Sequence, residues 1–196
     1  MKRLFLIVLM AAAVSATQAQ ITAERLEQAR REAAQAGKDK KEKEKQLQMV
    51  MDSVLYHNAA VSLYDSTFVI KADQIMFRRG AMAYVDQNTN FISMNKDKAT
   101  VQIAFNTIFA GPNGIGGVTV EGAPSNVSVS EDKRGNLTLT MSVVGVGISA
   151  QVSVTLWPGS NKAMATVVPN FNSRTITVYG NLYPISQTNV FKGTAL

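Results

Sequence analysis

The chain has 196 residues with no cysteine and one histidine, and its 20 Lys and Arg against 14 Asp and Glu give a net charge of +6. Without cysteine there can be no disulfide and no lipid-modified cysteine, and one histidine leaves a zinc ion without its usual ligands. The basic residues form no stripe with interleaved aromatic residues, so no nucleic-acid partner is expected.

Residues 1–19 have the three parts of a secretory signal peptide. Lys2 and Arg3 precede an apolar run over 4–14, and small and polar residues follow up to Ala19. The run is shorter than the roughly 20 apolar residues that span a bilayer. We expect cleavage after Ala19, or else after Ala16, and export to the periplasm or the cell exterior. The mature chain, with a charge of +6 − 2 = +4, is expected to be soluble and to lack a transmembrane segment.

Residues 20–63 are predicted to form a charged helical arm. Thr22 can cap the start of a helix, and strong helix formers dominate through Gln48. The charged run 38–45 has no apolar face, and Gly37 can bend or break the helix. Because heptads are not sustained, we interpret this part as a solvated spacer rather than an oligomerising coiled coil.

The arm ends in an amphipathic stretch. A stripe this broad needs a partner surface, and the β domain is the expected one. The single histidine, His57, lies on the stripe and is interpreted as a partly buried structural residue rather than a metal ligand. The stripe recurs at intervals of three and four residues: Leu47, Val50, Met51, Val54, Leu55, His57 and Val61.

Residues 64–196 are predicted to form an antiparallel β domain. All five prolines and twelve of the thirteen glycines lie beyond residue 61. About nine or ten short strands with alternating apolar residues follow one another, which indicates an antiparallel β-sandwich or a flattened barrel. A packed sandwich is favoured, because the inward positions are mostly Val, Leu, Ile and Ala. The predicted strands are 68–77, 82–85, 91–94, 98–105, 118–121, 127–130, 137–143, 148–156, 162–168 and 176–182.

The glycine-rich connection 110–117 joins two of the strongest strands. Neither Lys-Ser/Thr nor a helix follows it, so it lacks the elements that cradle a phosphate. We interpret its glycines as serving a turn or bulge that needs a left-handed backbone.

No constellation of catalytic residues is evident. The carboxylates of the β domain are scattered beside turns, and a Ser-His-Asp triad would have to use His57 without a Gly-x-Ser-x-Gly elbow. We therefore predict no catalytic residue, no cofactor and no metal. A carboxylate pair assembled in space would make a hydrolase, and this stays an alternative.

Three aromatic residues fall on the polar face of their strands: Trp157, Tyr179 and Tyr183. Exposed together, they are candidate surface-binding residues that would stack on a sugar or on a partner's side chain. The competing interpretation is that the stripe over 47–61 covers them, because large exposed apolar patches are uncommon.

A set of motifs gives the chain a family resemblance. They are Phe77-Arg-Arg-Gly80, Lys98-Ala-Thr-Val-Gln-Ile-Ala-Phe105, Ala110-Gly-Pro-Asn-Gly-Ile-Gly-Gly-Val118, Gly147-Ile-Ser-Ala150, Pro169-Asn-Phe-Asn172 and Val190-Phe-Lys-Gly193. With them, residues 48–195 resemble the secreted Bacteroidetes domain-of-unknown-function 4251 family. The resemblance implies an exported β-rich domain after a signal peptide and a charged helical lead, and it carries no activity and no site residues.

The leading hypothesis is a non-enzymatic exported envelope protein that binds a protein or an envelope component through its β domain. The first alternative is a lipocalin-like barrel that binds a small apolar ligand, and the second is a hydrolase with a carboxylate pair. The sequence specifies neither the partner nor the oligomeric state.

Overall fold

The computed structural model describes residues 2–104, 117–145, 149–170 and 175–193, with side chains from Arg25 onward. The chain divides into two compact units, Met1–Val50 and Met51–Leu196. The elements are α1 (Lys2–Tyr64), β1 (Thr67–Phe77), β2 (Met82–Tyr84), β3 (Phe91–Asn95), β4 (Lys98–Ala104), β5 (Gly117–Glu131), β6 (Leu137–Gly145), β7 (Ser149–Leu156), β8 (Lys162–Pro169), β9 (Ile176–Pro184) and the 3-10 helix η1 (Ile185–Gln187).

The first unit consists of helical backbone. The helix begins at Lys2 rather than at Thr22, and it continues through Gly37 without a break. Its side chains from Arg25 to Val50 are exposed, and pairs such as Arg31–Glu27 (3.2 Å) join successive turns. Such exposed i,i+4 pairs contribute only tenths of a kcal/mol each, so helix propensity holds this segment together. Within the described residues, no helix is both long and apolar enough to cross a membrane.

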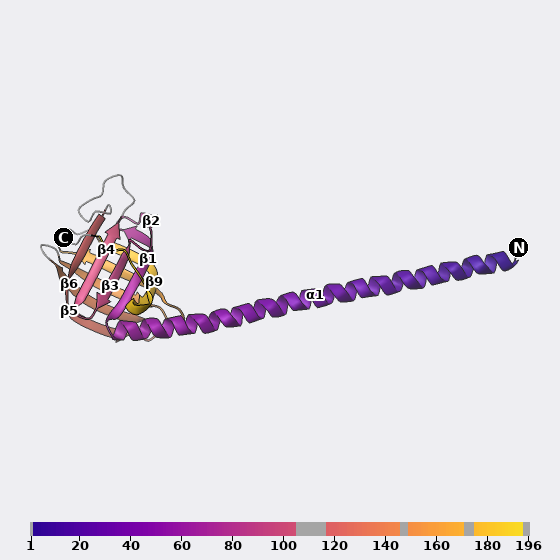
Figure 1. Ribbon diagram of the computed structural model, residues 1–196, viewed down its shortest axis with the longest axis horizontal. Coiled ribbons are helices and arrows are strands. Elements are labelled where there is room, and N and C mark those ends of the chain that lie inside the picture. Colours follow the sequence, from indigo (N-terminus) through magenta and orange to yellow (C-terminus); the bar gives the residue numbers. More distant parts are fainter. Residues whose placement is uncertain (1, 105–116, 146–148, 171–174, 194–196) are drawn as a thin grey trace. The chain divides into compact units, whose positions relative to one another are not determined.

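The strands of the second unit form one antiparallel sheet that closes on itself (Figure 1). Each strand from β3 to β9 pairs with the next one, and the β1–β9 pair joins the two ends of the sheet. β2 is an extra strand that pairs with β1 beyond the end of β3. The result is a closed barrel of eight strands plus one. The nine strands of the described residues fall within the predicted number. Of the two predicted architectures the barrel is the one formed, and the preference for a packed sandwich is wrong because β1 pairs with β9 and closes the sheet.

β5 differs from the prediction because it is one strand rather than two. Residues 117–122 pair with β4 and residues 122–131 pair with β6, so the strand passes from one neighbour to the other at Gly122. A Cβ atom at Gly122 would lie 2.0 Å from the carbonyl oxygen of Val144. Glycine therefore permits the close backbone approach at this corner of the barrel. Pro124 lies two residues after Gly122, the last residue paired with β4. Its missing N–H therefore removes no hydrogen bond between β4 and β5.

The interior of the barrel is filled by the alternate, inward-facing side chains of the eight strands. Among its largest fully buried residues are Phe68, Ile70, Leu139, Leu156 and Leu182. The alternation follows from the two-residue period of a strand. The same period made these positions predictable from the sequence.

The last turns of α1 close one end of this core. Ala59 and Leu63 are fully buried in the core cluster, with Tyr56 and Ala60 packed beside them. Burial, together with the negative charge of Glu131 at the start of the β5–β6 hairpin, raises the pKa of the Tyr56 hydroxyl. The helix therefore lies against the end of the barrel at which that hairpin turns.

The docked face of the helix is not the predicted stripe. Met51, Val54, His57 and Val61 are exposed, and so are Leu47 and Val50 in the first unit. The predicted stripe and the docked face lie on different sides of the helix, because the helix packs through Tyr56, Ala59, Ala60 and Leu63, and only Leu55 of the stripe is half-buried. The prediction of a partly buried His57 is wrong for the same reason.

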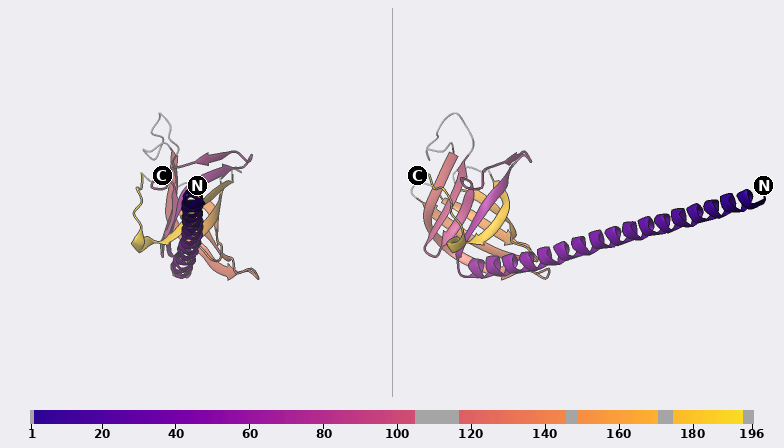
Figure 2. Two further views of the ribbon diagram at one scale, coloured as in Figure 1. Left: turned by 90° about the vertical axis from the view of Figure 1, so that its right-hand side faces the viewer. Right: turned by 45° about the vertical axis from the view of Figure 1, so that its right-hand side comes forward.

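The other end of the barrel is the one at which β1, β4, β6 and β8 end. The turn or bulge predicted for the glycine-rich connection 110–117 falls on residues 105–116, which lie outside the described part of the chain. The right-hand view of Figure 2 shows β1 beside β9, the two strands whose pairing closes the barrel.

Candidate binding surface on the outside of the barrel

The register of β7, β8, β9 and β1 places a row of polar and aromatic residues on the outer face. Lys162 of β8 and Lys71 of β1 are both register partners of Asn181 on β9. The backbone N–H of Trp157, just after β7, donates to the carbonyl oxygen of Lys162 at 3.2 Å. The row therefore runs across four neighbouring strands.

The three aromatic residues singled out from the sequence lie around this row. Tyr179 and Tyr183 flank Asn181 on β9, between the inward residues Val178, Gly180 and Leu182. Trp157, Tyr179 and Tyr183 are all half-buried. Within the second unit, the stripe residues Met51, Val54, His57 and Val61 are exposed and the helix docks through Ala59 and Leu63, so burial does not support the interpretation that the stripe covers the aromatics. We use the term aromatic face for Trp157, Lys162, Tyr179, Asn181, Tyr183, Lys71 and Asp73.

A turn at residues 86–90 supports the aromatic face from one side. Its own geometry is fixed by Asp86, whose carboxylate accepts the Asn88 N–H at 2.7 Å and whose carbonyl accepts the Asn90 N–H at 3.0 Å. Asn90 is buried, and its side-chain oxygen accepts the N–H of Ala104 at 2.8 Å. The carbonyl of Asn90 accepts the N–H of Ala72 at 2.9 Å. The turn is thus tied to β4 and to β1.

Side chains of this turn reach the aromatic face directly. The Gln87 amide donates to Asp73, and the Asn181 amide donates to the other carboxylate oxygen of Asp73 at 3.3 Å. The Lys71 ammonium donates to the Asn88 side-chain oxygen at 3.3 Å. These bonds hold an amide, a carboxylate and an ammonium group beside the tyrosines, in fixed positions on the surface.

A C-terminal segment lies on the neighbouring outer face. We call residues 188–193 the strap. The buried Gln102 amide donates to the carbonyls of Phe191 (2.7 Å) and Thr89 (2.9 Å), and its oxygen accepts from the Gly193 N–H (2.9 Å) and the Thr119 hydroxyl (3.0 Å). All four hydrogen-bonding positions of this amide are used, which is what burial of a polar side chain requires. The strap explains why Gln102, which points away from the core, is buried.

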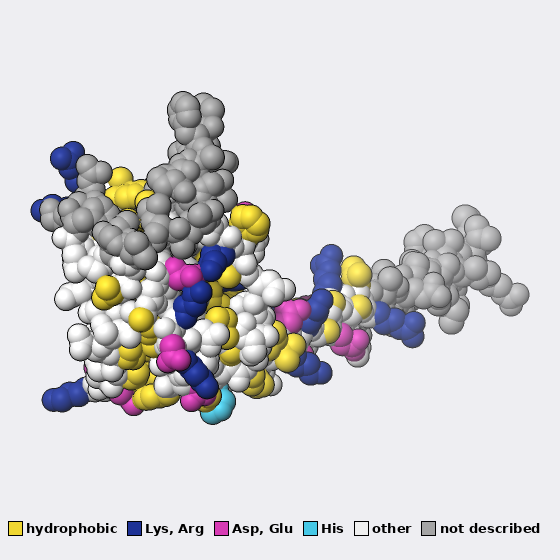
Figure 3. All heavy atoms as spheres, turned by 60° about the vertical axis from the view of Figure 1, so that its left-hand side comes forward, with side chains coloured by type: hydrophobic (Ala, Val, Ile, Leu, Met, Phe, Trp, Pro, Cys, Tyr) yellow, Lys and Arg dark blue, Asp and Glu magenta, His cyan; other side chains and the backbone are white. Residues whose placement is uncertain are grey.

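Ionic contacts fasten the strap further. Glu121 of β5 accepts from Lys98 at 2.6 Å and from Lys192 of the strap at 2.5 Å. Burial acts to raise the pKa of the Glu121 carboxyl, but the hydrogen bonds and charges of Lys192 and Lys98 outweigh it and lower that pKa. Acidic and basic side chains also lie side by side on the described part of the surface in Figure 3.

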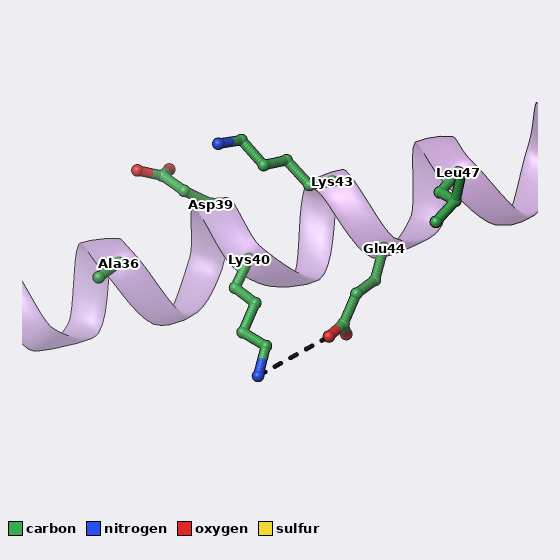
Figure 4. Close-up of a pocket in the computed structure, with 6 residues that line it drawn as sticks. All are labelled: Ala36, Asp39, Lys40, Lys43, Glu44 and Leu47. Atoms are coloured by element: carbon green, nitrogen blue, oxygen red, sulfur yellow. Dashed lines mark ion pairs between the residues drawn. The ribbon is translucent and has the colours of Figure 1, made fainter.

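Other places in the molecule offer less chemistry. Among the side chains that the structure describes, no three His, Cys, Asp or Glu residues gather to hold a metal ion. Figure 4 shows a depression on α1 next to the Lys40–Glu44 ion pair (3.9 Å), and its lining comes from a single helix. One helix alone cannot enclose a ligand. The lining residues are Ala36, Asp39, Lys40, Lys43, Glu44 and Leu47.

Trp157, Tyr179 and Tyr183 were predicted from the sequence, but the hydrogen bonds that surround them were not. Gln102 lies within the predicted strand 98–105, and nothing local indicates that residues almost ninety positions later will cover it. The one local indication that this position is covered is a polar amide between Val101 and Ile103, two residues that are themselves buried. The strap and its partners are therefore the part of this surface that the sequence did not reveal.

Comparison with known proteins places the chain in a family. A family model described as domain of unknown function, DUF4251, matches residues 39–182. The chain belongs to the DUF4251 family. The resemblance inferred from the motifs is thereby confirmed. A crystal structure of a DUF4251 family protein from Bacteroides eggerthii DSM 20697, at 1.95 Å resolution, is similar to this chain with 50% sequence identity and a TM-score of 0.64. The match covers 73% of this chain and 96% of that one. No curated protein matches the chain.

Proposed function

We propose that this DUF4251 protein is an exported, non-catalytic binding protein, which contacts a protein or an envelope component through the outer surface of its barrel. The observation that carries the proposal is that Tyr179 and Tyr183 flank Asn181 on β9, while Trp157 lies opposite Lys162, the register partner of Asn181. Tyrosine and tryptophan combine a large apolar body with a polar tip, and they are enriched where proteins bind partners.

Two further features support this proposal. The polar groups among the aromatics are held by Gln87 and Asn88 before any partner arrives, so little ordering cost remains at binding. The residues before Ala19 have the pattern of a signal peptide, which favours a partner in the periplasm or on the cell surface.

The test is capture of envelope components by the full chain and by a triple variant, Trp157→Ala/Tyr179→Ala/Tyr183→Ala. We expect the wild type to retain specific envelope components that the variant loses. Tyr64→Ala is the matched control, since Tyr64 is an exposed tyrosine outside the aromatic face. Equal retention by the wild type and by the triple variant would refute the proposed surface.

The closed barrel raises a second candidate function, binding of a small apolar ligand. A closed barrel of eight strands is just wide enough either to be filled by side chains or to hold one small ligand. The described interior positions are occupied by buried residues such as Phe68 and Leu139, which supports the filled state. Saturable uptake of an apolar fluorescent probe, lost in Ala165→Trp but kept in the triple variant, would favour this candidate instead.

A further inference from the structure

We propose that the aromatic face is a site for an acidic oligosaccharide, with sugar rings on the aromatic side chains and an acidic group between Lys71 and Lys162. This inference rests on the proposed function and specifies its ligand class. It follows from three properties of the face, which are the spacing of its rings, the kinds of polar groups between them, and its charge.

The aromatic rings provide the apolar part of sugar recognition. A sugar ring has a face of C–H groups that packs on an aromatic ring, and it has hydroxyl groups around its rim. Tyr179 and Tyr183 are two positions either side of Asn181 on one strand, so their Cα atoms lie about 13 Å apart along the sheet. Trp157 lies two strands away, opposite Lys162. Rings spaced in this way suit successive units of a chain rather than one small molecule.

The polar groups among the rings match hydroxyl groups. A hydroxyl both donates and accepts hydrogen bonds. Its best partners are therefore amides, which also do both, and carboxylates, which accept. Asn181, Asp73 and Gln87 form such a set, joined to one another by hydrogen bonds. A purely apolar protein contact would leave these groups without new partners, at a cost for each one.

The aromatic face carries two cations, Lys71 and Lys162, against one carboxylate, Asp73, whose two oxygens are bonded to Gln87 and Asn181, so its net positive charge favours an acidic sugar. Lys71 and Lys162 lie on opposite sides of Asn181, on strands two apart, so their Cα atoms are about 10 Å from one another. Within the described residues, neither ammonium group has a carboxylate at ion-pair distance, and Lys71 donates to the neutral Asn88 side chain. A carboxylate on the ligand would lie between two cations and over the Asn181 amide.

A single tryptophan makes the test direct. Trp157 is the one tryptophan of the chain, so its fluorescence reports on this face alone. The full chain is titrated with oligosaccharides of galacturonic, glucuronic or mannuronic acid, with a neutral glucose oligosaccharide, and with polyglutamate of the same charge. We expect at least one acidic oligosaccharide to change the emission saturably, and the neutral sugar and the peptide to bind at least about tenfold more weakly.

Variants locate the binding on the face. Tyr179→Ala and Tyr183→Ala are expected to weaken it about tenfold each, and Lys71→Met and Lys162→Met about threefold or more. Tyr64→Ala and Lys133→Met are the matched controls and are expected to leave it unchanged. Circular dichroism and the unfolding midpoint of each variant show whether the barrel is intact, and only folded variants are compared.

Several outcomes overturn the inference. Binding of polyglutamate as tight as that of the best sugar would identify an acidic protein segment as the ligand. Equal binding of the neutral sugar would remove the role of Lys71 and Lys162. Failure of all three acidic sugars, while the triple variant still loses its envelope components, would reject the sugar class and leave the proposed function standing.

Discussion

The inside of the barrel is stabilised by apolar packing, whereas the segments on its outside are held by hydrogen bonds. Inside, alternate residues such as Phe68 and Leu139 pack without direction and exclude water. Outside, buried polar groups such as Gln102 and Asn90 connect segments by directed hydrogen bonds. Apolar packing sets whether the barrel forms, whereas the outer network sets where the turn 86–90 and the strap lie. Substitutions on the two sides should therefore have different consequences.

The largest effect is expected inside. Phe68→Ala removes a fully buried ring from the core and should lower the free energy of unfolding by about 3–5 kcal/mol. Urea unfolding followed by circular dichroism measures the change. Tyr84→Ala on β2, where the side chain is 85% exposed, should stay within about 0.5 kcal/mol of the wild type. A similar loss in both variants would contradict the division between core and surface.

The next effect concerns the backbone contact at the corner of β5. Gly122→Val places a side chain where even a Cβ would meet the Val144 carbonyl at 2.0 Å, and backbone rather than a flexible side chain must move. We expect a loss of about 3 kcal/mol or failure to fold. Gly37→Ala, in open space on α1, serves as the control and should be neutral or slightly stabilising. A stable Gly122→Val protein would show that the corner is not a close contact.

The outer network should respond locally. Gln102→Leu keeps the size of the side chain but removes four hydrogen bonds, and we expect a loss of about 2 kcal/mol. Amide exchange of Phe191 and Gly193 should accelerate more than exchange in β7, because the strap opens while the barrel persists. Gln46→Leu on the exposed helix is the control. Uniform acceleration throughout the barrel would mean that the strap and the core unfold together.

One change on the outer side should increase stability. The Thr188 hydroxyl of the strap is buried, and within the described residues it has no hydrogen-bond partner. Thr188→Val replaces this hydroxyl by a methyl group of similar size and should raise the free energy of unfolding by about 1 kcal/mol. Thr140→Val, which removes a hydroxyl bonded to Ser128 at 2.8 Å, should have the opposite sign. Thermal unfolding of both variants compares them.

The smallest effect is expected at Glu121. Its ion pairs hold its pKa below the ordinary 4.5 in the folded state, so their stabilisation is present above pH 4.5 and is lost as the pH falls through the folded value. Lys98 and Lys192 are 58% and 45% exposed, and we expect Glu121→Gln to cost less than about 1 kcal/mol at pH 7. The difference should vanish at low pH and shrink in high salt. A difference that grows on acidification would contradict this assignment.

The same contrast explains what the sequence could predict. The positions and spacing of most strands followed from alternation in segments such as 137–143 and 148–156, since the core selects every second residue. β5 was misread because Gly122 and Pro124, which usually separate strands, here form a corner within one. Closure into a barrel was not decided, because it depends on pairing between β1 and β9 and no local pattern encodes that pair.

The outer surface was predictable only in part. Trp157, Tyr179 and Tyr183 were assigned to the polar faces of their strands from the two-residue period, and in the structure Tyr179 and Tyr183 alternate with the inward residues of β9, whereas Trp157 lies just after β7. Their neighbours Lys71, Asp73 and Gln87 come from distant parts of the chain and depend on the register across the closing pair. The predicted docking face of α1 is wrong because it followed the exposed stripe and left out Ala59, Ala60 and Leu63, of which the two alanines carry little weight in an apolar pattern.

Because the β1–β9 pair closes the barrel, the barrel can form only after β9 has been synthesised. Phe68 pairs with Pro184, so 184 − 68 = 116 residues separate the two sides of the closing contact. The chain must lose the entropy of closing this long loop before the pairing stabilises it, and folds dominated by such distant contacts form slowly. No fragment that ends before β9 can complete the barrel during synthesis. If the chain is exported as proposed, the barrel would still be open when the chain reaches the translocation machinery. It would close only after β9 has crossed the membrane.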